Sequence, residues 1–126
     1  MEEMAAPAPL TGYRILVVED EYYIADDLRR AALRLGAEVV GPAPTRERAL
    51  ELIVGPQRID LAVVDINLRG EIVFEVADAL EAQGVPFVFA TGYNHGAIPE
   101  RFGHVPCWSK PLDPHDLLRS LAGPEA

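Results

Sequence analysis

Short apolar runs alternate with helical patterns five times along this chain, and no other feature constrains the fold as strongly. The runs are too short for helices, and several are apolar throughout, as expected of strands covered on both faces. Strands that alternate with helices predict an α/β protein with a doubly wound, five-stranded parallel sheet and helices on both faces. The expected strands are Ile15–Val18, Glu38–Gly41, Leu61–Val64, Pro86–Ala90 and Val105–Trp108.

Apolar residues at helical spacing, together with capping residues and glycines, mark the expected helices. Because strand crossovers are right-handed, the flavodoxin-like strand order 2-1-3-4-5 is favoured. Asn94–Gly103 contains glycine and proline and few apolar residues, which predicts only a short or irregular helix there. The first expected helix has Ala25, Leu28, Ala32 and Leu35 on its inner face and ends at Gly36, and the second begins after the N-cap Thr45 and ends near Val54. The third has Val73, Val76, Ala77 and Leu80 on its inner face and ends at Gly84. The last helix has Asp113 as its N-cap and Pro114 at its first position.

The length of 126 residues predicts one domain, which we place at residues 13–122. Residues 1–12 are rich in Ala and Pro and predict a mobile, disordered leader, and residues 123–126 a short tail. The single cysteine, Cys107, excludes an internal disulfide.

The net charge of −9 argues against nonspecific nucleic-acid binding and against docking on anionic membranes. No apolar run approaches the roughly 20 residues of a membrane span. The acidic start Met1–Met4 lacks the basic segment of a signal peptide. We therefore expect a cytoplasmic protein.

Charged and hydroxyl side chains stand where four of the expected strands end. Glu19 and Asp20 follow the first strand, Asp65 the third, Thr91 the fourth and Lys110 the fifth. The carboxyl ends of parallel strands meet at one crevice, so we expect these groups to converge there. Carboxylate oxygens are the ligands that Mg²⁺ prefers. The set predicts a divalent-cation site beside a carboxylate that accepts a phosphoryl group.

With these residues in this order, the chain resembles a bacterial response-regulator receiver domain from about Tyr13 to Leu121. The string Phe89-Ala90-Thr91-Gly92-Tyr93 is similar to the signature of the FATGUY class of receivers. Receivers of that class occur as stand-alone regulators and attached to kinases of the HWE/HisKA_2 type.

The resemblance implies a role for each residue of the expected site. Asp65 is the phosphoacceptor, Lys110 neutralises phosphoryl oxygens, and Thr91 donates its hydroxyl to one of them. The cofactor is Mg²⁺ or Mn²⁺, and its implied ligands are Asp20, Asp65, the backbone carbonyl of Asn67, and Glu19 acting through water. Lys110-Pro111 resembles the family's cis dipeptide.

One departure from the family concerns the aromatic residue that standard receivers place three positions before the lysine. Here that position is Cys107, and Trp108 follows. We therefore expect the irregular-helix region to carry the conformational change, through Tyr93, Phe102 or Trp108. Tyr93 is bulky and is expected to hinder the water that hydrolyses the acyl phosphate. The expected modulating residues are Gly92, Tyr93, Cys107 and Trp108.

The implied partner is a histidine kinase, of the HWE/HisKA_2 type, or a phosphotransfer protein. Tyr22, Tyr23 and Ile24 are candidates for docking this partner. The signal is expected to pass by contact to an unidentified downstream protein or through a phosphorylation-dependent dimer. The domain is expected to catalyse only its own phosphoryl transfer and slow self-dephosphorylation.

Two alternatives to this function stay open. One is a pseudo-receiver that binds partners without phosphorylation, which the missing aromatic switch keeps open. The other is a small phosphatase with an aspartate nucleophile, disfavoured because Asn67 stands where such enzymes have a second acid.

Overall fold

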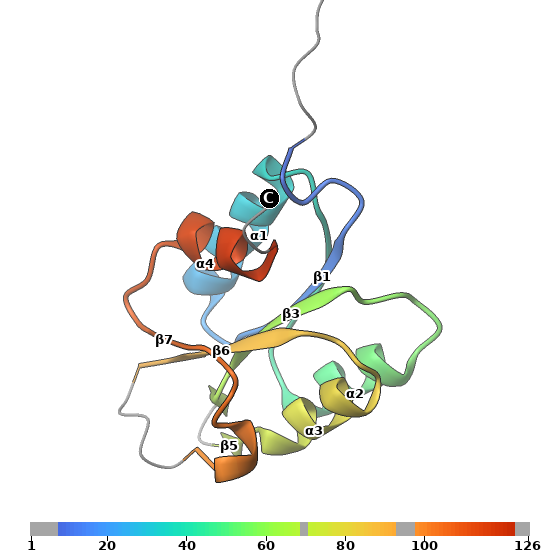
Figure 1. The fold of residues 1–126 in the computed structure, drawn as a ribbon, viewed down its shortest axis with the longest axis vertical. Coiled ribbons are helices and arrows are strands. Elements are labelled where there is room, and N and C mark those ends of the chain that lie inside the picture. The colour runs from blue at the N-terminus through green and yellow to red at the C-terminus, as the bar shows by residue number, and fades with distance from the viewer. Residues whose placement is uncertain (1–7, 69–70, 93–97, 123–126) are drawn as a thin grey trace, which may run out of the picture.

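A five-stranded parallel sheet organises the molecule. The computed structural model describes residues 8–68, 71–92 and 98–122 (Figure 1). Along the sheet the strand order is β2-β1-β3-β6-β7, and every neighbouring pair is parallel. Counted along the chain, this is the predicted order 2-1-3-4-5, and the prediction is confirmed. The strands are β1 (Arg14–Val18), β2 (Glu38–Ala43), β3 (Leu61–Asp65), β6 (Phe87–Thr91) and β7 (Cys107–Ser109).

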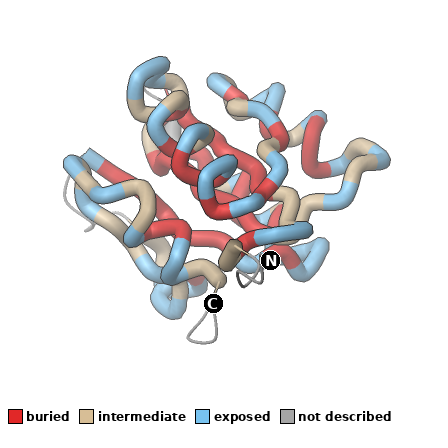
Figure 2. Tube along the Cα trace, turned by 90° about the horizontal axis from the view of Figure 1, so that it is seen from above, coloured by how far each residue is buried: buried red, intermediate tan, exposed pale blue. Residues whose placement is uncertain are grey.

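Helices cover both faces of the sheet. The helices α1 (Tyr22–Arg34) and α4 (Pro114–Ala122) lie on one face, and α2 (Arg46–Val54) and α3 (Phe74–Ala82) on the other (Figure 1). Successive strand side chains point to opposite faces, so each strand contributes to two separate hydrophobic cores. In β1, Ile15 and Val17 pack on the α1 side, whereas Leu16 and Val18 join the core under α2 and α3. The central strands β1, β3 and β6 are accordingly almost completely buried in the middle of the molecule, whereas the edge strands β2 and β7 are partly exposed (Figure 2).

The two predicted N-caps, Thr45 and Asp113, are confirmed. Thr45 Oγ1 accepts a hydrogen bond from the backbone N–H of Arg48 at 3.1 Å and so caps α2. Asp113 Oδ1 accepts from the N–H groups of His115 and Asp116, at 2.9 and 3.2 Å, and so caps α4. These bonds satisfy donors that a helix start leaves unpaired.

The segment before β7 contains a single turn of 3₁₀ helix, η1 (Glu100–Phe102), among its described residues. This agrees with the predicted short or irregular helix. The buried Phe102 ring anchors η1 to α3, since it stacks on Phe74 with ring centroids 5.7 Å apart. Beside it, Arg101 pairs with Asp78 of α3 through two bonds of 3.1 Å.

A small antiparallel hairpin follows β3, formed by β4 (Asn67–Leu68) and β5 (Glu71–Ile72). The sequence did not predict it, because two-residue strands are too short to show a period. Two X-Pro bonds are cis, the expected Lys110-Pro111 and also Gly41-Pro42.

The folded part of the chain begins earlier than predicted. Leu10 is completely buried against the α1 core, and its N–H donates to the carbonyl of Leu35 at 2.8 Å. The expectation of a mobile leader through residue 12 is therefore wrong for residues 8–12. The Ala/Pro composition hid a single buried leucine that docks beneath the end of α1. The remaining leader, residues 1–7, and the tail, 123–126, lie outside the described residues.

None of the helices within the described ranges is both long enough and apolar enough to cross a membrane.

Candidate functional site

The sheet brings the predicted site residues to its carboxyl edge. Glu19 follows β1, Asp65 and Thr91 are the last residues of β3 and β6, and Lys110 follows β7. The backbone fixes these ends against one another, because the N–H of Lys110 donates to the carbonyl of Thr91 at 2.8 Å. The convergence that parallel strands predict is therefore present.

The ammonium of Lys110 joins three carboxylates. Its Nζ lies 2.9 Å from Glu19 Oε1, 3.1 Å from Asp65 Oδ2 and 3.7 Å from Glu21 Oε1. The side chains of Glu19 and Asp65 are almost entirely buried, while that of Glu21 is exposed. Lys110 thus compensates charge that would otherwise be unpaired inside the protein.

Asp65 is held at both carboxylate oxygens. Oδ2 accepts from Lys110, and Oδ1 accepts from the backbone N–H of Asn67 at 3.1 Å. Only 5% of the residue is exposed. The carboxylate is therefore fixed in orientation at the end of a central strand.

Burial dominates the electrostatics of Glu19. It raises the pKa of Glu19 to about 7, against the lowering effect of the hydrogen bond from Lys110, and the charge of Asp65 adds to the rise. For Lys110, burial lowers the pKa, but the bonds and charges of Glu19 and Asp65 outweigh it and the net shift is upward. Lys110 is therefore a permanent cation beside a carboxyl that titrates near neutral pH.

The three acids that were predicted around a cation do lie together. Glu19, Asp20 and Asp65 each offer a carboxylate oxygen, and these oxygens all lie within 4.8 Å of one another. An all-oxygen donor set of this kind suits Mg²⁺ or Mn²⁺. The residues present therefore fit the cation that the sequence implied.

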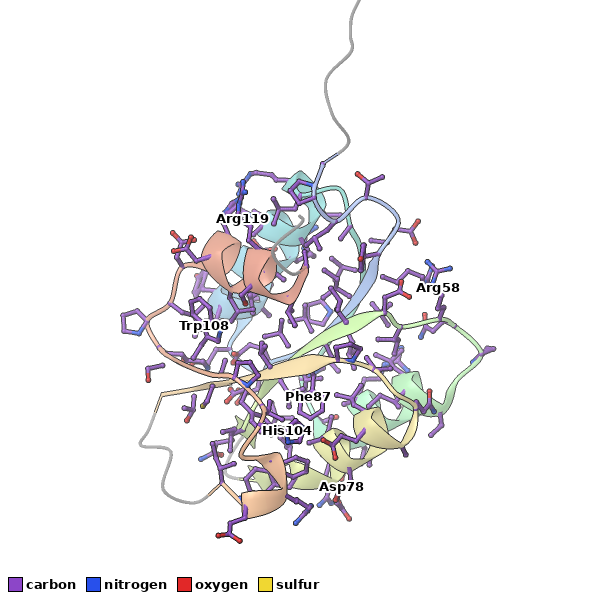
Figure 3. The ribbon with its side chains drawn as sticks, in the orientation of Figure 1. Arg58, Asp78, Phe87, His104, Trp108 and Arg119 are labelled. Carbon is purple, nitrogen blue, oxygen red and sulfur yellow. The ribbon has the colours of Figure 1, made fainter. Side chains whose placement is uncertain are left out.

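The other predicted residues surround this centre at different depths. Thr91 is buried and Gly92 is exposed at the end of β6. Cys107 packs against the α2–α3 core, and burial raises the pKa of its thiol, so it is not an activated nucleophile. Trp108 points to the opposite face and packs beside α4 (Figure 3). Tyr93 lies outside the described residues.

Sequence reasoning assigned no role to Glu21, although the structure brings it to Lys110. The signal was visible, because Glu21 is the third acid of the string Glu19-Asp20-Glu21. Glu21 lies one position beyond the expected ligands, and the start of α1 sets its position. The sequence does not show in which direction its side chain points.

Two pockets flank the site on either side of the α1 start. One, of about 450 Å³, is bounded by Glu19, Asp20, Arg29 and the prolines Pro42 and Pro44, among others. The other, of about 430 Å³, is lined by residues of the α1 start and of the turn after β7: Glu21, Ile24, Asp27, Leu28, Gly92, Lys110, Pro111, Leu112 and Pro114.

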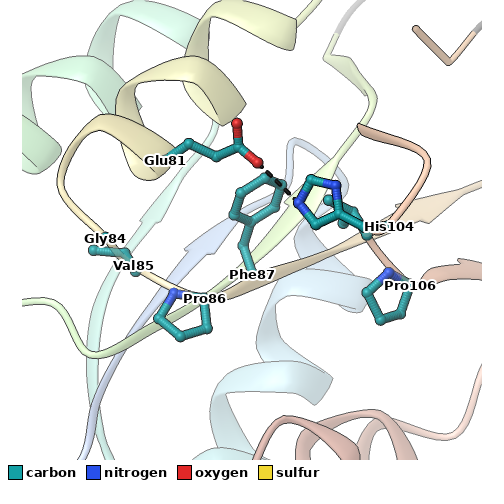
Figure 4. A pocket seen from close by; sticks show the side chains of 8 residues that line it. Glu81, Gly84, Val85, Pro86, Phe87, His104 and Pro106 are labelled. Atoms are coloured by element: carbon teal, nitrogen blue, oxygen red, sulfur yellow. Dashed lines mark ion pairs between the residues drawn. The ribbon is translucent and has the colours of Figure 1, made fainter. Parts of the chain in front are cut away.

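A third pocket, of about 490 Å³, lies at the opposite edge of the sheet, where β6 begins (Figure 4). Phe87 forms part of its wall, and His104 Nε2 lies 3.1 Å from Glu81 Oε2 across it. It contains none of the predicted site residues.

Comparisons with known proteins agree with this geometry. No family model matches the chain. Over 90 residues, 70% of the chain, it is 38% identical to the phyllosphere-induced regulator PhyR of Methylorubrum extorquens, and the match covers 32% of that protein. The chain spans about a third to a half of the length of the curated relatives it matches.

Solved structures give fuller coverage. SdrG from Sphingomonas melonis Fr1 superposes with a TM-score of 0.74 at 38% identity, over 90% of this chain and 97% of SdrG. SdrG has also been solved in a BeF₃-activated conformation, at a TM-score of 0.69 and 36% identity over 93% of this chain and 94% of that one. A CheY-like response regulator receiver domain protein from Methanospirillum hungatei JF-1 gives 0.71 at 26% identity, over 86% and 90% of the two chains.

The sheet order, the acidic cluster beside a lysine and these relatives lead to one family. The chain belongs to the bacterial response-regulator receiver domains.

Proposed function

We propose that this receiver signals by accepting a phosphoryl group on Asp65 in a Mg²⁺-dependent transfer. One observation carries the proposal: the ammonium of Lys110 is held 3.1 Å from the buried carboxylate of Asp65, beside the cluster of Glu19, Asp20 and Asp65. A carboxylate so placed attacks phosphorus to form an acyl phosphate.

The surroundings of Asp65 prepare it for attack. The N–H of Asn67 and the ammonium of Lys110 fix its two oxygens, so little reorganisation precedes the reaction. Once the phosphoryl group is bound to Asp65, Lys110 is the cation that can pair with its oxygens. The buried Thr91 at the end of β6 is proposed to donate its hydroxyl to one of these oxygens.

Four residues are proposed to hold the cation: Asp20 and Asp65 directly, Asn67 through its backbone carbonyl, and Glu19 through water. Bound there, Mg²⁺ would neutralise the oxygens of two anions that must approach each other. The carboxylate of Glu19 already accepts from the N–H of Glu21 at 3.1 Å and from Lys110. Its part is therefore to hold Lys110 and a water rather than to reach a cation itself.

The proposed phosphodonor is the phosphohistidine of a histidine kinase or a phosphotransfer protein. The string Phe89-Ala90-Thr91-Gly92-Tyr93 favours a kinase of the HWE/HisKA_2 type. The exposed rings of Tyr22 and Tyr23 at the start of α1 offer an apolar docking surface next to the site. The related SdrG adopts a BeF₃-activated conformation, which supports a phosphoryl-dependent response here.

The pseudo-receiver alternative is less well supported, because the chain keeps an acceptor, a cation-site cluster and a lysine in contact. The phosphatase alternative lacks its second acid, since Asn67 follows Asp65 at that position.

The direct test is the intact mass of the protein after incubation with phosphoramidate and Mg²⁺. We expect the mass of one phosphoryl group to be added, and the adduct to be absent from the Asp65→Asn variant and when EDTA replaces Mg²⁺. Asp60→Asn is the matched control, because Asp60 directly precedes the strand that Asp65 ends, and it should retain the adduct. An adduct that persists in Asp65→Asn would assign the chemistry to another residue.

A further inference from the structure

The carboxylate of Glu21 lies at the mouth of the site, and the chemistry above does not use it. Glu21 precedes α1 as its N-cap, but its side chain makes no capping hydrogen bond. The side chain is 64% exposed and reaches toward Lys110, with Oε1 3.7 Å from Nζ. It is therefore directed at the site rather than at its own helix.

Glu21 lies close to the proposed nucleophile, Asp65. The same Nζ lies 3.1 Å from Asp65 Oδ2, so a single ammonium group separates the two carboxylates. Glu21 also lines the pocket of about 430 Å³ that contains Gly92 and Lys110, and Asp27 is the other acid on its wall. A phosphodonor that approaches Asp65 from this side has its leaving group next to Glu21.

We propose that Glu21 is a specificity-determining residue that favours phosphodonors with a P–N bond over acyl phosphates. The inference rests on the proposed phosphorylation of Asp65 and names the class of donor for that site. The P–N class includes phosphohistidine and phosphoramidate; acetyl phosphate represents the acyl phosphates.

The reason is the charge of the leaving group. With phosphoramidate, which is protonated on nitrogen near neutral pH, an Asp65 oxygen bonds to phosphorus while the P–N bond breaks. Its electron pair stays on nitrogen, and neutral ammonia leaves. Part of the positive charge remains on the N–H groups while the P–N bond is only partly broken, so a nearby carboxylate lowers the energy of the transition state relative to the free donor.

With acetyl phosphate the same P–O bond to Asp65 forms, but the electron pair of the broken bond stays on oxygen and acetate leaves as an anion. Glu21 then faces growing negative charge, which raises the barrier. Because Glu21 is exposed and water screens it, the effect is modest in size.

The test compares initial rates of phosphorylation by phosphoramidate and by acetyl phosphate, measured by intact mass with Mg²⁺ present. In Glu21→Gln we expect the rate with phosphoramidate, divided by the rate with acetyl phosphate, to fall about two- to fivefold relative to the wild type. Glu21→Asp keeps the charge and should keep most of the preference. High salt should shrink the difference between wild type and Glu21→Gln.

Glu51→Gln is the matched control, since Glu51 is exposed to 67% on α2 and pairs with Arg48 instead of with Lys110. It removes the same charge and should leave the ratio unchanged. A ratio that is equal in the wild type and Glu21→Gln overturns the inference, even if both rates rise together because Lys110 is freed. Absence of any adduct on the wild type would instead overturn the proposed phosphorylation itself, and this inference with it.

Discussion

At the scale of single residues, the site concentrates negative charge around one cation. Lys110 is the only cation that the structure shows in contact with the buried carboxylates of Glu19 and Asp65 among the described residues. One ammonium cannot fully compensate two buried carboxylates, so one of them resists ionisation. Burial is the main cause of the raised pKa of Glu19, and the charge of Asp65 adds to it.

Glu19 therefore links the stability of the metal-free protein to pH. In the folded state Glu19 keeps its proton up to about pH 7, whereas in the unfolded chain it loses the proton near 4.5. The folded state binds more protons in this window, so stability falls as pH rises through it. In EDTA, we expect the free energy of unfolding of the wild type to fall between pH 5 and pH 7.5 by on the order of 1–3 kcal/mol more than that of Glu19→Gln.

Urea unfolding at the two pH values measures this difference. Gln still accepts a hydrogen bond from Lys110, so the variant should remain folded. Glu51→Gln should follow the wild type, because Glu51 is exposed on the distant α2 surface. Parallel pH profiles for the wild type and Glu19→Gln would show that Glu19 is ionised throughout.

At the scale of elements, η1 depends on one side chain for its position. Phe102 is 1% exposed and contacts the rings of Phe74, Phe87 and Phe89 at centroid distances between 5.7 and 6.3 Å. The Arg101–Asp78 pair next to it is half exposed on both sides. Aromatic burial, and not the ion pair, therefore holds this turn on α3.

Substitutions in η1 should separate the two contributions. We expect Phe102→Ala to lower the free energy of unfolding by about 3–5 kcal/mol. Arg101→Ala should lower it by less than about 1 kcal/mol, because an exposed ion pair contributes little. Chemical denaturation measures both, and Tyr23→Ala, which truncates an exposed ring, serves as the control. Equal losses for Phe102→Ala and Arg101→Ala would contradict this view of the anchor.

The response to phosphorylation is also expected at this scale. Cys107 occupies the position of the usual aromatic residue, and Trp108 is the single tryptophan of the chain. We expect the fluorescence of Trp108 to change when phosphoramidate and Mg²⁺ are added, because Trp108 pairs with Ala90 of β6, next to Thr91, which is expected to move toward the modified Asp65. Asp65→Asn is the control and should show no change. If Phe102 and Trp108 keep identical environments, as seen by NMR, with and without phosphate, then the η1 region does not carry the signal.

At the scale of the whole molecule, the described residues before β1, 8–13, pack onto the α1 core. Leu10 fills the α1 core together with Leu35 and Ala37. We expect Leu10→Ala to lower the free energy of unfolding by about 2–4 kcal/mol, as for other buried leucines. Leu33→Ala is the matched control, because Leu33 is half exposed on α1 and should change stability little. A loss as small as that of Leu33→Ala would place residues 8–12 outside the cooperative unit.

Local patterns in the sequence were sufficient for much of this protein. Apolar runs at a strand's length, helical spacing and the caps Thr45 and Asp113 depend on neighbouring residues. They were therefore enough to predict the five strands of the main sheet and the helices that cover it, and crossover handedness favoured the observed strand order. The acids, Thr91 and Lys110 were predictable as a group because strand ends of a parallel sheet meet.

Only the tertiary structure decided how those groups share charge. Three features depend on residues that are far apart along the chain: the burial of Glu19, the contact of Glu21 with Lys110 and the docking of Leu10. Packing sets the distances between these residues. The hairpin after β3 was likewise not predictable, because its two-residue strands are too short to show a periodic pattern of apolar residues. A pattern shows which side chains reach an edge of the sheet, whereas desolvation and pairing there depend on every element that packs around it.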